Sequence, residues 1–377
     1  MHIGLPCLTF LQVSFSPLAE DCLLPSAHSA MAKPTLSDPK IPLGSTVLVT
    51  GANGLIASHV VDQLLAAGYN VRGTVRNPSK SAWMGPLFSS RHPSRRLEIV
   101  QVSDFGAPGA WDDAVKGVAG VAAVAGGAGL DLQDVEKAVE QELPWNEALL
   151  EAAKKEPSVK SFVFTSSAWA AWTPDPTKKV KLTEWSFNDH ALQVVRSDTS
   201  AEEKGILPYM AFKTLLEQRI WDWINKEKPS FSFCTVLPDT VIGECLDPKN
   251  QGVPSTSGMV KQLYDGINLE VLAQIPAQWH ADTRDTGLLY VAALIVPGVD
   301  RERLFGFSDR YSWPRVGQIL KELYPGHDMP TLDTNGWDQT DVPNKRGEEL
   351  LRVLGHNGWT KLEDSVKACA ESFMQIE

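Results

Sequence analysis

The chain has 377 residues, of which 43% are hydrophobic, and this is enough for one large domain or two smaller ones. The formal net charge of −11 matches neither nucleic acid nor an anionic membrane, and no apolar run is long enough to span a bilayer. The five cysteines are odd in number, widely spaced and form no Cys-x-x-Cys pair. We therefore predict a reduced, cytoplasmic protein without a structural metal, nucleic-acid partner or membrane partner.

The first part of the chain shows no pattern that a folded core could use. Ile3 to Leu24 is moderately apolar, but prolines and acidic residues interrupt it, and the basic start of a secretory signal is missing. A second plausible start of the sequence is Met31-Ala-Lys. We predict a disordered or adventitious extension over residues 1–40 and keep the secretory signal as the alternative.

Short apolar strands alternate with amphipathic helices after this extension. Thr46 to Thr50 is a β-branched apolar run of the kind that forms a buried parallel strand. A glycine-containing turn follows, then a helix from Leu55 to Ala67 that ends at Gly68, then a second strand over Tyr69 to Val75. These segments form a complete βαβ unit.

The same alternation continues through the first two thirds of the chain. The pattern predicts a strand at Leu97–Val102, a helix start at Trp111–Val115, a strand at Gly120–Ala125, a helix at Asp134–Lys155, a strand at Val159–Thr165, a helix at Tyr209–Lys226 and a strand at Phe231–Leu237. Such regular alternation is typical of α/β proteins with a doubly wound parallel sheet of the Rossmann type. We predict a main domain over 41–243, to which part of 280–300 returns, and a smaller mixed region over 244–377.

A glycine-rich turn joins the first predicted strand to the first predicted helix. Gly51 allows a tight turn, Gly54 lets the backbone approach a pyrophosphate, and the small Ala57 lets the helix pack closely on the strand. The helix N-terminus attracts phosphates. In this strand–turn–helix context the motif indicates a dinucleotide-binding site. The residues of the turn that we expect to contact the dinucleotide are Gly51, Asn53, Gly54, Leu55 and Ile56.

The end of the second strand distinguishes NADPH from NADH. An NAD site places an acidic residue there to bind the ribose 2′-hydroxyl. This chain instead has Arg72 and Arg76, with Lys80 shortly after, and guanidinium groups suit a 2′-phosphate. We predict NADPH as the cofactor, and the alternative is that Arg72 or Arg76 is a solvated loop charge. Asp104, after the third strand, either contacts the adenine or caps the following segment.

A candidate catalytic pair opens the long helix. The i,i+4 spacing of Tyr209 and Lys213 places the phenol and the ammonium on one helix face. The lysine favours the phenolate and so brings the tyrosine pKa from about 10 toward neutrality, and it can also hydrogen-bond the nicotinamide ribose. Upstream, Ser166 and Ser167 end a strand at the sheet edge where ligands bind. A serine there can hydrogen-bond a substrate carbonyl oxygen as negative charge develops on it.

The sequence resembles the extended short-chain dehydrogenases of the NAD-dependent epimerase/dehydratase superfamily over roughly residues 44–370. The segments that carry the resemblance are TVLVTGANGLIASHVVDQLLAAGYNVRGTVRN, PSVKSFVFTSS, YMAFK, FSFCTVLPDTVIG and RDTGLLYVAAL. It is most similar to fungal NADPH-dependent aldehyde and carbonyl reductases, relatives of the plant dihydroflavonol 4-reductases. The resemblance implies Ser167 rather than Ser166 as the catalytic serine and Tyr209 as the proton donor. It also implies that Ala125 and Pro238 lie beside the cofactor.

Three segments depart from the pattern of that family. Relatives often have His or Ser after the fourth strand, where this chain has Val121 to Gly127. The Asn that orders the catalytic lysine through water in relatives is missing here or displaced to Asn146. A bulky pair, Trp169 and Trp172, follows the two serines. These departures bear on the choice of substrate more than on the chemical step.

The wall of the substrate site is predicted from aromatic residues and from the neighbours of the serines. Ala168, Trp169 and Trp279 are the candidates, since ligand pockets favour aromatic linings. Core packing is the alternative for both tryptophans. His280 has aspartates nearby but no second strong ligand at metal-site spacing, so we assign it a structural role.

We predict an NADPH-dependent reductase of a small carbonyl substrate, a monomer or homodimer, in a biosynthetic route to a polyketide-like metabolite. A nucleotide-sugar epimerase or dehydratase is the first alternative, but such enzymes need an acidic residue at the second strand. A non-catalytic NADP-sensing regulator is the second alternative, and such proteins commonly lose the Tyr–Lys pair that this chain retains.

Overall fold

The computed structural model describes residues 36–127, 129–333 and 336–376. Most of the predicted N-terminal extension lies outside the described residues. Lys40, at its C-terminal end, belongs to the folded unit: its ammonium donates to Oγ of Ser232 at 2.9 Å and to the carbonyls of Ala293 at 2.8 Å and Val299 at 2.6 Å. The extension predicted over 1–40 is therefore wrong at this end, because three acceptors anchor Lys40.

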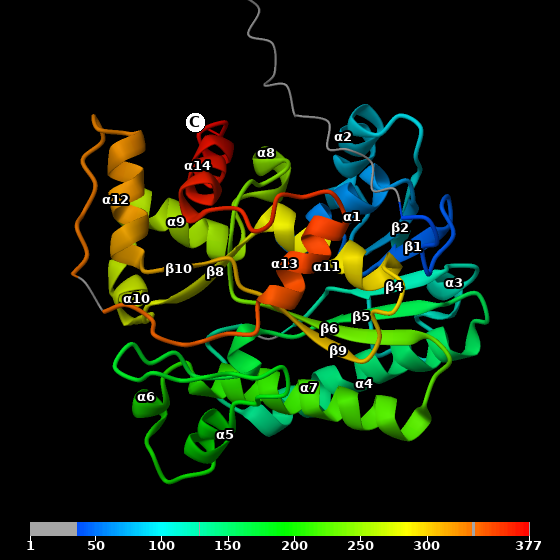
Figure 1. The fold of residues 1–377 in the computed structure, drawn as a ribbon, viewed down its shortest axis with the longest axis horizontal. Helices are drawn as coiled ribbons and strands as arrows, with labels where there is room; N and C mark the ends of the chain where they lie inside the picture. Colours follow the sequence, from blue (N-terminus) through cyan, green and yellow to red (C-terminus); the bar gives the residue numbers. More distant parts are fainter. Residues whose placement is uncertain (1–35, 128, 334–335, 377) are drawn as a thin grey trace, which may run out of the picture. The chain divides into compact units, whose positions relative to one another are not determined.

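The main sheet of the described chain has seven parallel strands in the order β3-β2-β1-β4-β5-β6-β9 (Figure 1). The strands are β1 Thr46–Val49, β2 Asn70–Val75, β3 Leu97–Gln101, β4 Gly120–Ala123, β5 Ser161–Thr165, β6 Ser232–Pro238 and β9 Glu302–Gly306. From β1 the chain first builds outward to β3 and then returns to β4 on the other side of β1. Such a switch point leaves a crevice at the carboxyl ends of the strands, where ligands bind. The predicted Rossmann-type fold is confirmed.

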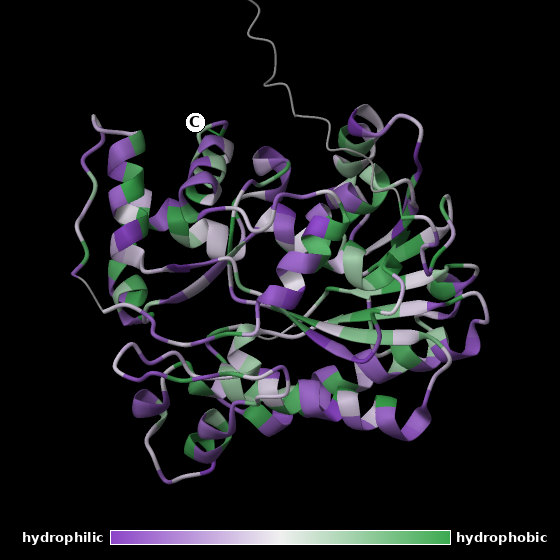
Figure 2. Cartoon of the chain, viewed as in Figure 1, coloured by the Kyte–Doolittle hydropathy of each residue, from purple (hydrophilic) through white to green (hydrophobic). Residues whose placement is uncertain are grey.

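Helices cover both faces of this sheet (Figure 1). On one face lie α1 Leu55–Ala66, α11 Thr283–Ile295 and α13 Lys345–Val353, and on the other lie α4 Val135–Lys155 and α7 Leu207–Glu227. Each face has its own hydrophobic core, because successive side chains of a strand point to opposite faces. Figure 2 shows the central strands as mainly hydrophobic, whereas hydrophilic residues line the outer sides of the helices.

A smaller sheet, in the order β10-β8-β7, stands beside the crevice. It is mixed, since β7 Thr240–Ile242 pairs parallel with β8 Gln278–Asp282, and β8 pairs antiparallel with β10 Asp309–Tyr311. A third hydrophobic core lies among α9 Ser255–Asp265, α12 Trp313–Leu323 and α14 Leu362–Phe373. The remaining helices are η1 Ser79–Ser81, α2 Met84–Arg91, α3 Asp112–Val115, η2 Ala168–Ala170, α5 Asp189–Val195, α6 Ala201–Lys204, α8 Pro248–Gln251 and α10 Leu269–Gln274.

The chain passes between the two sheets more than once. After β8 it returns to the main sheet through α11, which packs against α1, and then adds β9 to the edge beside β6. The described chain from residue 36 onward forms one compact unit. Residues on both sides of position 243 therefore belong to the same folded unit. The predicted division at that position stays a proposal about function.

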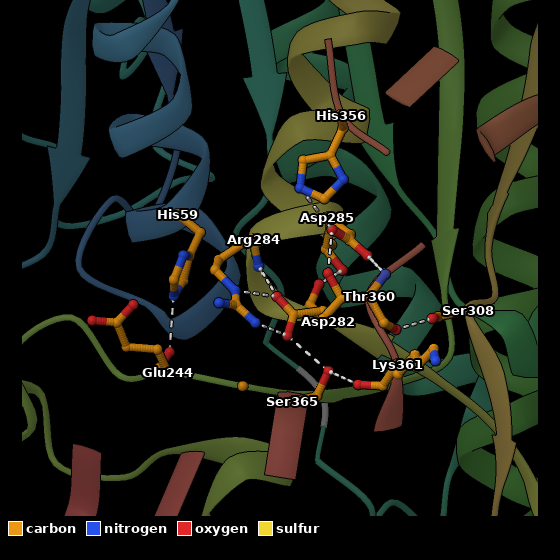
Figure 3. A network of polar contacts seen from close by, with 12 residues as sticks. His59, Glu244, Asp282, Arg284, Asp285, Ser308, His356, Thr360, Lys361 and Ser365 are labelled. Carbon is orange, nitrogen blue, oxygen red and sulfur yellow. Dashed lines mark hydrogen bonds and ion pairs between the residues drawn. The ribbon is translucent and has the colours of Figure 1, made fainter. Parts of the chain in front are cut away.

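A buried polar network joins the β8–α11 junction to the C-terminal segment (Figure 3). The carboxylate of Asp282 accepts from Nε and Nη2 of Arg284, each at 2.8 Å, and from Oγ of Ser365 at 2.7 Å. Burial disfavours its charge, but the Arg284 contacts outweigh burial and lower the pKa of Asp282. Asp285, in the first turn of α11, accepts from the backbone N–H of Thr360 at 2.6 Å. Burial and the neighbouring Asp282 charge raise the pKa of Asp285 to about 7.

The raised pKa of Asp285 makes stability depend on pH. The folded protein keeps this proton up to about pH 7, whereas the unfolded chain loses it near the ordinary value of 3.8. The contribution of Asp285 to stability is therefore full below about pH 4 and is lost as the pH rises to about 7. We expect Asp285→Asn, which cannot ionise, to gain on the order of 1 kcal/mol or more relative to the parent between pH 5 and pH 8.

The measurement is the free energy of unfolding by denaturant at both pH values. Asp364→Asn, an exposed aspartate on α14, is the matched control and should show no such change. An equal difference between Asp285→Asn and the parent at pH 5 and pH 8 would contradict the prediction.

Candidate active site

The glycine-rich turn lies between β1 and α1, at the switch point of the sheet. Gly51 has φ +61°, and a Cβ there would lie 3.0 Å from the Cβ of Ala125, so the turn requires glycine. Gly54 precedes α1 without a side-chain cap, and no acidic residue stands in the first turn. Leu55 and Ile56 open the helix and line the adjacent cavity. The helix end therefore presents uncapped N–H groups and a positive dipole end, as the pyrophosphate of a dinucleotide requires.

Side-chain hydrogen bonds hold this turn against β4. Oγ1 of Thr50 accepts from the backbone N–H groups of Val124 and Ala125, each at 2.9 Å. Ala125 thus lies beside Gly51, and its predicted contact with the cofactor stays a prediction. Asn53 is exposed at the tip, where its carbonyl accepts from the side chain of Gln251 at 3.1 Å. The C-terminal region therefore touches the glycine-rich turn directly.

The structure gives the two arginines predicted for the cofactor phosphate, Arg72 within β2 and Arg76 just after it, different surroundings. Nε of Arg72 donates to Glu98 at 3.1 Å, and its Nη1 donates to the carbonyls of Ala114 at 3.0 Å and Lys116 at 2.9 Å. Arg72 is thus occupied by β3 and the C-terminal end of α3, and the prediction that it reaches the cofactor phosphate disagrees with this geometry. Arg76 follows β2 directly and is exposed.

Two other residues predicted to contact the cofactor follow the strands β2 and β3. Lys80 is exposed in η1, shortly after Arg76. Asp104 is exposed after β3, and its carboxylate accepts from the backbone N–H of Gly106 at 2.9 Å. Of the basic residues predicted for the phosphate, the structure therefore leaves Arg76 and Lys80 exposed and available.

A cavity of about 460 Å³ adjoins the turn at the carboxyl ends of the strands. The predicted residues that line it are Leu55, Ile56, Ser167, Trp169, Tyr209, Lys213 and Pro238. The main lining residues that the sequence did not single out are Glu142, Phe212, Asp239, Met259, Ile275 and Gln278. Residues from both sheets therefore meet at one cavity, with the predicted catalytic residues on its wall.

Tyr209 and Lys213 lie one turn apart near the start of α7. The ring of Tyr209 stands edge-on to Trp169, with centroids 6.0 Å apart, and the Lys213 ammonium lies 3.5 Å from the carbonyl of Thr165. Burial raises the pKa of Tyr209 to about 12, and the Glu142 carboxylate adds to this rise. Burial lowers the pKa of Lys213, which the Glu142 and Glu217 charges oppose. The expected shift of the tyrosine pKa toward neutrality is wrong for this structure, because burial and Glu142 act in the other direction.

The two serines at the end of β5 have different surroundings. Ser166 is 3% exposed, and its hydroxyl donates to Oε2 of Glu217 at 2.7 Å. Oγ of Ser167 accepts from the backbone N–H of Trp169 at 3.2 Å, which leaves its own proton free to donate into the cavity. This difference favours Ser167 as the partner of a substrate oxygen, in line with the resemblance.

A fully buried ion pair lies directly beneath the serines. Arg303 of β9 donates to both carboxylate oxygens of Glu217 of α7, each at 2.8 Å. Thr235 of β6 donates to the same carboxylate at 2.8 Å. Arg303 also donates to the carbonyls of Glu184 at 2.8 Å and Ser186 at 2.6 Å. The pair therefore ties α7, β6, β9 and the segment before α5 to one point under the site.

The two tryptophans predicted to line the substrate site differ in position. The alternating direction of side chains along β8 explains the difference. Trp169 lines the cavity, and its Nε1 donates to Oε1 of Gln278 at 2.6 Å. Trp279 does not line the cavity: its Nε1 donates to Asp338 at 2.9 Å, and Arg310 stacks 4.3 Å from its ring. The proposed substrate role of Trp279 therefore disagrees with the structure, because neighbouring strand residues point to opposite faces and Gln278 takes the cavity side. Ala168 is fully buried in η2 and does not line the cavity either.

Glu142 is the main site residue that the sequence reasoning missed. It is 5% exposed on α4, and its Oε2 accepts from the backbone N–H of Gly127 at 2.9 Å. Its spacing from Val135, Val139 and Leu149 places it on the apolar stripe of that helix, and a charge on such a stripe was the available signal. The amide of Asn146 donates to the Glu142 carbonyl at 2.9 Å, and Asn146 does not line the cavity.

Neither a metal centre nor a membrane-spanning helix is found among the described residues. Among the residues that the structure describes, no group of three His, Cys, Asp or Glu side chains is placed to hold a metal ion. His280 is fully buried, with Nδ1 3.0 Å from the carbonyl of Asp309. Within the described ranges no helix combines the length and the apolar composition needed to cross a membrane.

A glycine-rich turn and an uncapped helix at the switch point of a parallel sheet define the doubly wound class of dinucleotide-binding proteins. Within that class the chain belongs to the NAD dependent epimerase/dehydratase family, whose model matches residues 47–278. Aldehyde reductase 2 of Sporidiobolus salmonicolor is 36% identical over 330 residues, which cover 87% of this chain and 95% of that protein. Ketoreductase adrE of Penicillium rubens is 38% identical over 339 residues, covering 87% and 96%.

A solved structure with the same fold is Gre2 from Candida albicans in complex with NADPH. Its TM-score is 0.72 at 23% identity, and the match covers 89% of this chain and 100% of that one. The predicted resemblance and the predicted enzyme class, an oxidoreductase, are confirmed by the family and by its named reductases.

The buried ion pair beneath the serines should be essential to stability. We expect Arg303→Met to lower the free energy of unfolding by about 3–5 kcal/mol, because it leaves the Glu217 charge buried and unpaired. The matched control is Arg346→Met. It breaks a partly exposed ion pair of 2.8 Å with Glu302, which lies on β9 like Arg303, and should lower the free energy of unfolding by about 1 kcal/mol or less. Denaturant unfolding measures both, and equal costs would show that burial of the pair is not what matters.

Proposed function

We propose that this protein reduces a small aldehyde or ketone with NADPH and that Tyr209 gives the proton. The observation that carries the proposal is the partly buried phenol of Tyr209, which lines one cavity with Ser167 and Lys213. With a pKa of about 12 this phenol is protonated at physiological pH, as a proton donor must be. Relatives named aldehyde reductase and ketoreductase support the same class of substrate.

The residues present fit a nicotinamide dinucleotide. The turn from Gly51 to Gly54 and the uncapped start of α1 would hold the pyrophosphate, while Lys213 would hydrogen-bond the nicotinamide ribose and Pro238 would lie beside the ring. When bound, NADPH supplies the hydride that forms the new C–H bond at the carbonyl carbon.

The side chains of the cavity would carry out the remaining steps. The free hydroxyl proton of Ser167 donates to the substrate oxygen, and the donation strengthens as negative charge develops there. Tyr209 then transfers its proton to that oxygen, and the Lys213 ammonium stabilises the phenolate that remains. Trp169 and Phe212 line the cavity and keep water from the reacting atoms.

The setting of the reaction follows from the resemblance rather than from the geometry. We propose a role in fungal secondary metabolism of the polyketide type, in the cytoplasm, for a monomer or homodimer. A nucleotide-sugar epimerase or dehydratase shares the family description. Net consumption of NADPH by an added aldehyde or ketone distinguishes the two, because epimerases and dehydratases return their cofactor to its starting state.

Cofactor choice provides one test of the proposal. We expect Arg76→Ala to raise the KM for NADPH by about 10- to 100-fold and to leave the KM for NADH nearly unchanged, because a charged contact to the 2′-phosphate is lost. Arg72→Ala is the matched control, since that guanidinium is already paired with Glu98, and it should lower stability without changing the choice of cofactor. Equal turnover of NADPH and NADH by the unmodified protein would refute the proposed specificity.

The chemical step provides the second test, measured as NADPH oxidation with a panel of aldehydes, ketones and diketones. Tyr209→Phe should lower kcat by orders of magnitude and leave NADPH affinity nearly unchanged, because the phenol acts mainly on the transition state. Ser167→Ala should lower kcat by about 100-fold. Ser166→Ala should lower kcat much less and chiefly reduce stability, since its partner is Glu217. Near-normal kcat in Tyr209→Phe would end the reductase proposal.

A further inference from the structure

The carboxylate of Glu142 is a buried charge whose role the proposed mechanism does not yet include. It lines the cavity together with Tyr209 and Lys213, although it comes from a different helix, α4. Its Oε2 is held by the backbone N–H of Gly127 at 2.9 Å, and Gly127 also lines the cavity. Among the described residues no basic side chain forms an ion pair with it. Burying an unpaired carboxylate is costly, so its neighbours should include a group that depends on its charge.

The surroundings of Lys213 show which group that is. Two carboxylates, Glu142 and Glu217, act on the ammonium of Lys213. The charge of Glu217 is balanced by the two hydrogen bonds from Arg303, each 2.8 Å long. Across the cavity, burial raises the pKa of Asp239 well above its usual range, so this carboxyl adds little charge. Glu142 is therefore the uncompensated negative charge in the cavity, and Lys213 is the positive one.

We propose that Glu142 is a positioning residue that keeps both Tyr209 and Lys213 protonated, as hydroxyl and ammonium, across the physiological pH range. The proposal rests on the function proposed above. In the reductive step the O–H bond of Tyr209 breaks, the proton goes to the substrate oxygen, and a phenolate remains beside Lys213. A negative charge near both groups disfavours loss of either proton, because removing a proton from each makes the cavity more negative. After each turnover the phenolate takes up a proton from solvent, and the negative charge of Glu142 favours this return to the hydroxyl form.

The test removes the charge and keeps the shape. Glu142→Gln retains the volume and can still accept from Gly127, so the loop stays in place. We expect the phenol of Tyr209 in the cofactor-free protein to titrate about 1 pH unit lower than in the parent. NMR of ¹³C-labelled tyrosine measures this, and a Tyr209→Phe spectrum identifies the signal. The basic limb of the pH profile for reduction should move down by a similar amount.

Two further variants on the same helix sharpen the comparison. Glu140→Gln makes the same charge change at an exposed position of α4 and should move neither the titration nor the profile. Glu142→Asp retains the charge and should restore most of the parent profile. An unchanged phenol titration and an unchanged basic limb in folded Glu142→Gln would overturn the proposal.

The outcomes also separate this proposal from the function on which it rests. If Glu142→Gln failed to fold, the parent alone would still test the idea, since a Tyr209 phenol already ionised at about pH 10 contradicts a pair that keeps both protons. If Tyr209→Phe kept near-normal kcat, the proposed function would fail while the cofactor-free titration still reported on Glu142.

Discussion

The buried pair of Glu217 and Arg303 is the contact on which the geometry of this site depends. It joins a helix from one face of the sheet to the edge strand β9, which arrives from the far end of the sequence. Two opposite charges with 0% side-chain exposure are stable together only because further donors satisfy the remaining oxygen lone pairs. One of those donors is Ser166, so the pair fixes the strand end from which Ser167 faces the cavity.

Helix α7, which carries Glu217, also carries two other ionisable groups of the site at regular intervals. Tyr209, Lys213 and Glu217 are each four residues apart, so they form one stripe that runs from the cavity down to the buried pair. Glu217 pairs with Arg303 and so anchors α7. Its charge also opposes, together with that of Glu142, the lowering of the Lys213 pKa by burial. The stripe therefore links the anchoring of the helix to the electrostatic balance of the cavity.

Local patterns predicted most of the fold and much of the candidate site, because the alternation of strand and helix, the glycine-rich turn and the Tyr-x-x-x-Lys spacing are all short-range features. The predictions were wrong where the structure depends on the partner that a side chain faces or on pairing between strands that are distant in the sequence. Trp279 was assigned to the site as an aromatic residue and Arg72 by its position on the second strand, although both side chains bind other partners. Strand β9, Glu302–Gly306, was missed because it lies outside the regular alternation of strands and helices and joins the sheet only by pairing with β6.

Glu142 illustrates a different limit of sequence reasoning. An isolated carboxylate on an apolar helix stripe signals that something nearby requires a charge, but the stripe does not say what that is. The answer depends on α4 and α7 packing side by side, which brings Glu142 to the cavity that Tyr209 and Lys213 line. The proton state of the tyrosine is consequently a property of two helices and the loop after β4. A helical Tyr–Lys pair by itself favours the phenolate, whereas the same pair, partly removed from solvent and near the Glu142 carboxylate, favours the hydroxyl.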